Sequence, residues 1–105
     1  MAERITHADF EEKVIKFPGV AVVDFYSDSC VPCKRMSPVL AALEAQYRDE
    51  IYVAKVNIAY ETELTEAYGI RSTPTLLLFH NGELAERVSG VKKKQELEQL
   101  IEAHK

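Results

Sequence analysis

The chain contains two cysteines, Cys30 and Cys33, separated only by Val31 and Pro32. A single pair excludes both a framework of several disulfides and a four-cysteine zinc site within one chain. Two thiols three residues apart are close enough to form a disulfide. The pair also stands where an apolar run gives way to a helix-like pattern, and this placement is typical of a redox-active dithiol.

A helix that begins at the pair would give the two thiols different roles. The unpaired backbone N–H groups and the positive dipole end of a helix N-terminus stabilise a thiolate. Pro32 suits this first turn, which does not need the N–H that proline lacks. We therefore expect Cys30, at the exposed start of the helix, to attack disulfides, and Cys33, one turn further in and more buried, to resolve the mixed disulfide.

Asp24 and Lys55 are charged residues inside runs that read as strands. Burial would raise the pKa of Asp24, and a carboxyl group near Cys33 could then take and return its proton. The alternative is an aspartate at a strand end that points to solvent, and position alone does not decide between the two. Lys55 either pairs with Asp24 or reaches solvent.

Composition predicts one soluble globular domain spanning residues 1–105. The chain has 105 residues, of which 47% are hydrophobic, enough to bury a core without a disulfide. This weakens a purely structural interpretation of the cysteines. The net charge of −4 argues against a basic surface for nucleic acid.

The N-terminal sequence lacks the apolar core of a signal peptide, and the apolar stretches have the length of strands. We therefore expect a cytoplasmic protein with no membrane span, in a compartment where a lone Cys-x-x-Cys is more often catalytic or metal-binding than structural. His7, His80 and His104 show no ligand spacing with the cysteines, which disfavours metal capture across a dimer. We expect a monomer with no metal and no cofactor.

The hydrophobic pattern predicts the elements that position these residues. The pattern and turn signals indicate helices, in residues 7–17, 32–48 and 63–68 and around Leu97, Leu100 and Ile101. They also indicate strands, in residues 20–26, 51–56, 75–79 and 84–89. Asn81-Gly82 predicts an antiparallel hairpin. The resulting α/β order predicts a mixed sheet covered on both faces.

Together the motifs resemble the thioredoxin family over nearly the whole chain, in both order and spacing. The matching segments are Val22-Val23-Asp24-Phe25, Cys30-Val31-Pro32-Cys33-Lys34, Pro38, Val53-Ala54-Lys55-Val56-Asn57, Tyr68-Gly69-Ile70-Arg71, Thr73-Pro74-Thr75-Leu76-Leu77-Leu78-Phe79, Asn81-Gly82 and Gly90. The resemblance implies the thioredoxin fold, a central mixed β-sheet flanked by helices on both faces. It also implies reduction of disulfides in client proteins by dithiol exchange, with recharging by a thioredoxin reductase.

The resemblance also assigns site residues. It gives the proton-handling role to Asp24, with Lys55 beside it. It implies a cis peptide at Thr73-Pro74, although X-Pro bonds in general are far more often trans. The loop around Thr73 and the turn at Gly90 would border the cysteines and bind the backbone of a substrate.

Four positions depart from the family pattern. Ser29 and Val31 stand where the family usually has Trp and Gly, Tyr26 replaces a second Trp, and Ala59 replaces an acidic residue. Ser29 removes a large apolar surface beside the nucleophile, and β-branched Val31 restricts the loop between the thiols. Either change affects the substrate-binding surface and can move the reduction potential, in a direction that the sequence leaves open.

These departures keep two other hypotheses open. The chain could be a binding or regulatory module that uses the dithiol as a latch. It could also be a thiol oxidant or isomerase with an altered reduction potential.

Overall fold

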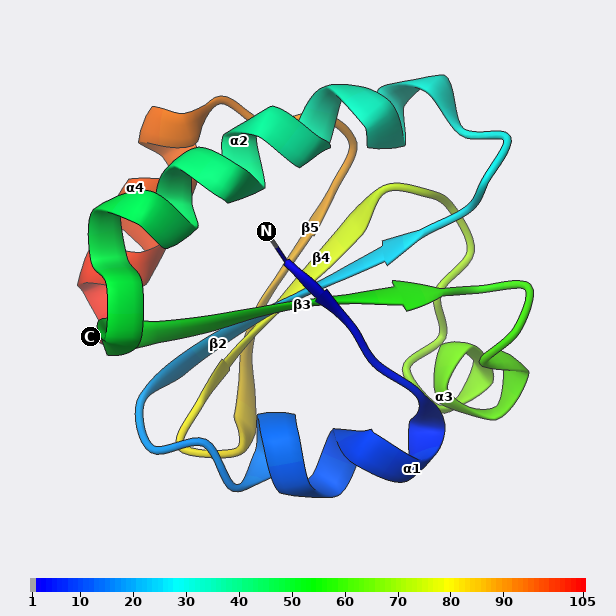
Figure 1. Cartoon of the computed structure of the whole chain (residues 1–105), viewed down its shortest axis with the longest axis horizontal. Helices are drawn as coiled ribbons and strands as arrows, with labels where there is room; N and C mark the ends of the chain where they lie inside the picture. Colours follow the sequence, from blue (N-terminus) through cyan, green and yellow to red (C-terminus); the bar gives the residue numbers. More distant parts are fainter. Residues whose placement is uncertain (1) are drawn as a thin grey trace.

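The computed structural model describes residues 2–105, which form a five-stranded mixed sheet with the strand order β1-β3-β2-β4-β5 (Figure 1). The strands are β1 (Glu3–Arg4), β2 (Val20–Tyr26), β3 (Ile51–Asn57), β4 (Thr75–His80) and β5 (Glu83–Ser89). β1, β3 and β2 run parallel, whereas β4 is antiparallel to β2 and β5 is antiparallel to β4. The predicted mixed sheet is confirmed.

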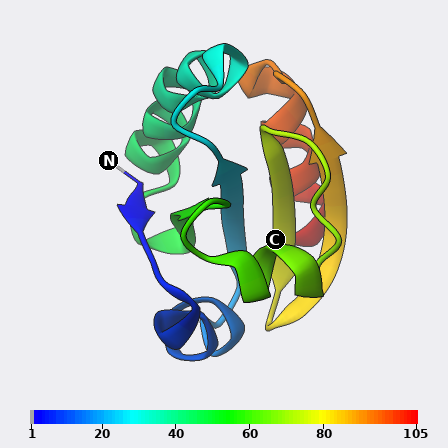
Figure 2. The same cartoon turned by 90° about the vertical axis from the view of Figure 1, so that its right-hand side faces the viewer.

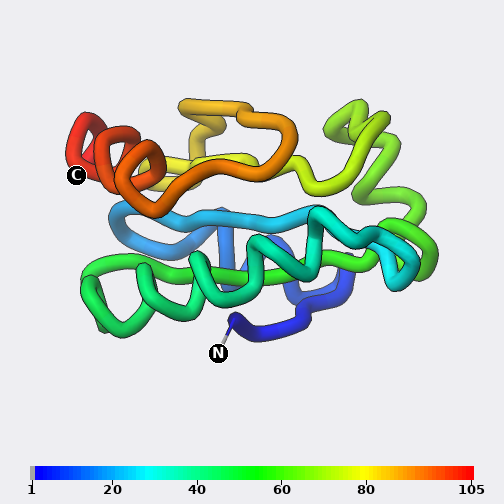
Figure 3. Tube along the Cα trace, turned by 90° about the horizontal axis from the view of Figure 1, so that it is seen from above, coloured from blue at the N-terminus to red at the C-terminus, as the bar shows by residue number. Residues whose placement is uncertain are grey.

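Helices cover both faces of this sheet. They are α1 (His7–Phe10), α2 (Val31–Tyr47), α3 (Thr62–Ala67) and α4 (Lys94–His104). α1 continues into the π-helical turn η1 (Glu11–Ile15), and α2 is followed by the 3-10 turn η2 (Arg48–Glu50). α2 and α4 lie over one face, and α1 and α3 lie over the other (Figures 1 and 3). This is the predicted α/β arrangement.

Strand alternation divides the core into two layers. On β2, Val20 and Val22 pack under α2 and α4, whereas Ala21, Val23 and Phe25 pack on the side of α1 and α3. Successive side chains of a strand point to opposite faces, so every second residue of β2 belongs to the same layer. By this rule Asp24, between Val22 and Tyr26, belongs to the α2 layer.

Two local features differ from the sequence-based expectations. The two-residue strand β1 was not predicted, because both of its residues are exposed and carry no hydrophobic pattern. The first helix is not a regular α-helix throughout, since the N–H of Lys16 donates to the carbonyl of Glu11, five residues earlier. The wider turn still leaves Val14 fully buried.

The β4–β5 turn at Asn81-Gly82 is fastened to the loop that precedes β2. The N–H of Asn81 donates to the carbonyl of Gly19 at 2.9 Å, and the N–H of Gly19 donates to Oδ1 of Asn81 at 2.8 Å. Both turn residues have positive φ, 51° and 85°. A Cβ on Gly82 would lie 2.5 Å from the carbonyl oxygen of Ile15, so the turn needs glycine for space as well as for conformation.

We predict that Gly82→Ala destabilises the protein more than Gly69→Ala. Gly69 has φ of 62°, but a Cβ there would meet nothing within 4 Å. Both variants place alanine at positive φ, which costs about 1–2 kcal/mol, and only Gly82→Ala adds a clash with backbone. Urea unfolding of the two variants measures the difference, and equal losses in the free energy of unfolding would contradict the close approach of the turn to Ile15.

Candidate active site

The cysteine pair occupies the first turn of α2. Cys30 is the N-cap residue and is joined to Cys33 by a disulfide, with a Cα–Cα distance of 5.2 Å. The backbone N–H of Cys33 donates to Sγ of Cys30 at 3.0 Å. The Cys30 sulfur therefore lies at the positive end of the helix, where N–H groups stabilise a thiolate after reduction.

Both cysteines are buried in the disulfide form, so the expectation of an exposed Cys30 is wrong for this state. Cys30 is 8% exposed and Cys33 is 4% exposed. Tyr26, the last residue of β2, forms one buried cluster with the two cysteines. The ring of Tyr26 and the helix turn therefore shield the sulfurs, although Cys30 keeps the greater exposure of the two.

Asp24 is fully buried in β2, and the solvent-facing alternative is wrong. Its neighbours across the sheet are Lys55 on β3 and Leu76 on β4. Neither carboxylate oxygen of Asp24 has a hydrogen-bond partner within residues 2–105. Burial raises the pKa of Asp24 from 3.8 to about 6, and the positive charge of Lys55 partly opposes this rise.

Lys55 matches neither of the two alternatives expected for it, an ion pair with Asp24 or a side chain that reaches solvent. It is the direct neighbour of Asp24 in the sheet, but no salt bridge joins the two side chains. Its Nζ lies 4.6 Å from the ring centroid of Tyr26 and donates to Oγ of Ser37 at 3.4 Å. The ammonium group is only partly exposed, so it acts on Asp24 through its charge rather than through a hydrogen bond.

Two further loops meet at this end of the sheet. The Thr73–Pro74 peptide is cis, and the N–H of Gly90 donates to the carbonyl of Pro74 at 2.9 Å. Figure 2 looks onto this end and shows the start of α2 close to the start of β4 and the end of β5. Pro74 is buried and Thr73 and Gly90 are half-buried.

Ser29 and Val31, the two replacements within the cysteine motif, are at the surface. Ser29 and Pro32 are exposed, and the side chain of Val31 is 60% exposed. Val91, directly after Gly90, is also exposed, at 43%. Apolar side chains therefore reach solvent on both the α2 loop and the β5–α4 loop.

Comparison with known proteins decides the family. The family model described as Thioredoxin matches residues 1–103. The chain belongs to the thioredoxin family. It is 36% identical over 101 residues to a thioredoxin of Rickettsia bellii, covering 96% of each chain, and 36% identical to a thioredoxin of Rhodospirillum rubrum, covering 96% of this chain and 97% of the relative. It is 35% identical over 103 residues to thioredoxin 1 of a Nostoc species, covering 98% of this chain and 96% of the relative.

Family membership and the paired cysteines together make the chain a thiol–disulfide oxidoreductase. The predicted family, fold and type of reaction are confirmed. Within residues 2–105, no helix combines the length and the apolar character that crossing a membrane requires. In the same residues, no group of three or more His, Cys, Asp or Glu side chains is placed to hold a metal ion.

Sequence reasoning missed two contacts around the thioredoxin-type centre. Tyr26 forms one buried cluster with the two cysteines, and its ring lies under Nζ of Lys55. The N–H of Lys92 donates to Sδ of Met36 at 3.4 Å, which fastens the β5–α4 loop to α2. The contacts of Tyr26 with Lys55 and of Lys92 with Met36 join segments that are distant in the sequence, so no local pattern indicates them.

We predict that Asp24→Asn makes the oxidised protein more stable at neutral pH. Asp24 titrates at 3.8 when unfolded and at about 6 when folded. As the pH rises through this window, the unfolded chain releases the proton first and stability falls. The rise in pKa corresponds to a cost of about 3 kcal/mol above the window, which the variant avoids.

Urea unfolding at about pH 7.5 and about pH 3.5 measures this effect, because the gain should disappear once both states are protonated. Asp49→Asn is the matched control, since Asp49 is exposed. If Asp24→Asn retained the stability-versus-pH profile of the parent protein, the buried, unpartnered carboxyl would not be the cause.

Proposed function

We propose that residues 1–105 act as one domain that reduces disulfides in client proteins and is recharged by a thioredoxin reductase. The observation that carries the proposal is the Cys30–Cys33 disulfide at the N-terminus of α2, in the same layer as the buried Asp24. The relatives named thioredoxin over nearly their whole length support the direction of electron flow. We further propose that the protein works as a monomer in the cytoplasm, without a cofactor and without binding nucleic acid.

The proposed reaction consists of two exchanges. The Cys30 thiolate attacks one sulfur of the client disulfide, that disulfide breaks, and the other client sulfur leaves as a thiolate. Cys33 transfers its proton to Asp24 and attacks Sγ of Cys30, which releases the second client thiolate. Two electrons pass from the cysteine pair to the client, and the Cys30–Cys33 disulfide remains.

The other residues of the site have supporting roles in this proposal. Lys55 moderates the proton affinity of Asp24, in accord with its effect on the pKa of Asp24. Pro32 lies in the first turn of the helix that stabilises the Cys30 thiolate, where its missing N–H is not needed. The client backbone binds beside the cysteines, along a surface formed by Ser29, Val31, Thr73, Pro74 and Gly90.

A binding or regulatory role is the second candidate, and the exposed Val31 favours it. In this candidate the surface around the dithiol binds partners without exchanging disulfides. It requires that partners bind without a mixed disulfide to Cys30. Capture of clients therefore discriminates between the two functions.

We predict that Cys33→Ser accumulates mixed disulfides between Cys30 and client proteins. The first exchange proceeds in this variant, but nothing then attacks Sγ of Cys30. Affinity purification under non-reducing conditions, followed by release with a thiol, measures the captured proteins. The control is the double variant Cys30→Ser/Cys33→Ser, and capture of the same proteins in the same amounts by the control would favour the binding role.

A further inference from the structure

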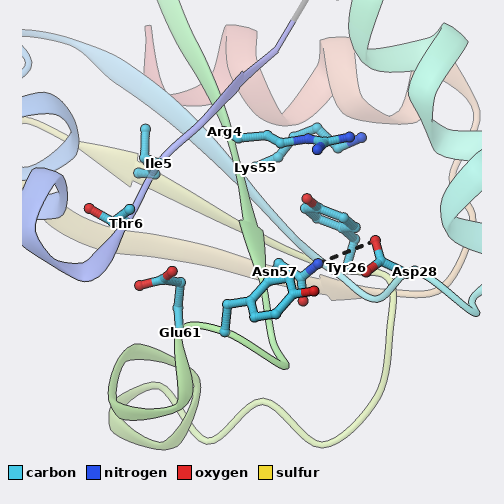
Figure 4. A pocket seen from close by; sticks show the side chains of 9 residues that line it. Arg4, Ile5, Thr6, Tyr26, Asp28, Lys55, Asn57 and Glu61 are labelled. Atoms are coloured by element: carbon cyan, nitrogen blue, oxygen red, sulfur yellow. Dashed lines mark hydrogen bonds between the residues drawn. The ribbon is translucent and has the colours of Figure 1, made fainter.

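Two cations lie side by side at the edge of the sheet near the disulfide. Arg4 of β1 is the direct partner of Lys55 on β3, and Lys55 is the partner of Asp24 on β2. Figure 4 shows the side chains of Arg4 and Lys55 next to each other above Tyr26. Like charges directly opposite each other on neighbouring strands are destabilising unless something else compensates them.

Neither cation has a carboxylate partner in the described part of the chain. Each salt bridge found in residues 2–105 involves other cations, and none involves Arg4 or Lys55. Both instead lie over the ring of Tyr26, with Cζ of Arg4 at 5.9 Å and Nζ of Lys55 at 4.6 Å from its centroid. A ring face attracts cations but does not neutralise their charge.

The two cations line a pocket with a volume of about 280 Å³ at the carboxyl ends of β1, β3 and β2, which we call the Arg4–Lys55 pocket. Its lining residues are Arg4, Ile5, Thr6, Tyr26, Asp28, Lys55, Asn57, Tyr60 and Glu61. Crevices at the carboxyl ends of parallel strands are frequent ligand sites.

The acidic residues of this pocket already accept hydrogen bonds. Oδ1 of Asp28 accepts from Nδ2 of Asn57 at 3.3 Å, and Oε1 of Glu61 accepts from the backbone N–H of His7 at 2.8 Å. In Figure 4 Glu61 lies beside Thr6, away from the two cations. These donors are neutral N–H groups, so Asp28 and Glu61 keep their negative charges, but neither forms a salt bridge with Arg4 or Lys55. The two positive charges lie side by side above Tyr26, where a ligand carboxylate could meet both.

We propose that the Arg4–Lys55 pocket binds a carboxylate side chain of the client protein, close in sequence to the client's reacting cysteine. Tyr26 connects the two sites, because its ring lies beneath both cations and also packs with Cys30 and Cys33. A client bound at the disulfide therefore has the pocket within short reach. This inference rests on the proposed function and adds the class of client that the site prefers.

The span from the disulfide to the pocket can be expressed as a number of residues of the client chain. An extended chain advances about 3.3 Å per residue, so an aspartate or glutamate roughly two to four positions from the client cysteine would span the ring of Tyr26. The carboxylate would meet two unpaired cations, and the arginine fork can bind it in a bidentate way. Clients with an amide at the same position would leave both cations unpaired.

Peptide disulfides that differ in one side chain test the proposal. Each peptide carries Glu or Gln three residues before or after its disulfide-bonded cysteine. Reduced protein is mixed with each peptide, and the released peptide thiol is quantified by chromatography to give a second-order rate constant. We expect the better-placed Glu peptide to react about fivefold faster than its Gln counterpart, as expected for one or two partly exposed ion pairs.

Variants connect this preference to the pocket. Arg4→Gln should reduce the Glu-to-Gln rate ratio towards one, Arg4→Lys should largely restore it, and added salt should lower it in the parent protein. Arg48→Gln is the matched control, because it also removes one exposed arginine charge, but at the other end of α2. The control should keep the ratio of the parent protein.

The outcomes separate this inference from the proposed function. Equal rates for Glu and Gln peptides at both placements, or a preference that persists in Arg4→Gln, would overturn the carboxylate site while leaving the reductase intact. Failure to reduce any of the peptides would instead contradict the proposed function.

Discussion

The contact on which this site depends is the one between the backbone of Cys33 and the sulfur of Cys30. It exists because β2 ends at Tyr26 and α2 begins only a few residues later, with Cys30 as its N-cap. The same helix start places one sulfur against unpaired N–H groups and draws the other into the buried turn. A difference between two chemically identical thiols therefore follows from where the helix begins.

Burial of Asp24 is the second constraint, and it opposes stability. A carboxyl group without hydrogen-bond partners is costly in an apolar layer, and the protein tolerates it in the middle of β2. Strand alternation places this carboxyl in the layer of α2, the helix that carries the cysteines. Lys55 reduces this cost through its positive charge, which lowers the pKa of Asp24. Lys55 also lines the surface pocket, so a ligand bound there would act on the proton affinity of Asp24 through Lys55.

The sequence predicted the elements with strong patterns and missed those that depend on contacts between distant segments. β2 and α2 were predicted because a continuous apolar run and a helical stripe are visible without any partner. β1 was not predicted, since its two exposed residues carry no hydrophobic pattern. The pairing of Arg4 with Lys55 was therefore missed as well, because it depends on the register of β1 against β3. The burial of Cys30 was also missed, because it arises from packing against Tyr26. The cis peptide at Thr73–Pro74 was expected from the family resemblance and not from general frequencies.

The reduction potential of the Cys30/Cys33 couple, measured by equilibration with glutathione buffers, tests most directly whether this pair works as a reductase. Ser29 and Val31 alter the surface and the loop between the thiols, whereas Cys30 is the N-cap of α2 and Asp24 is buried, as the family resemblance implied for this site. We expect a potential close to that of thioredoxin, about −270 mV. A value near that of a strong oxidant, about −120 mV, would contradict the account and indicate a protein that donates disulfides instead of reducing them.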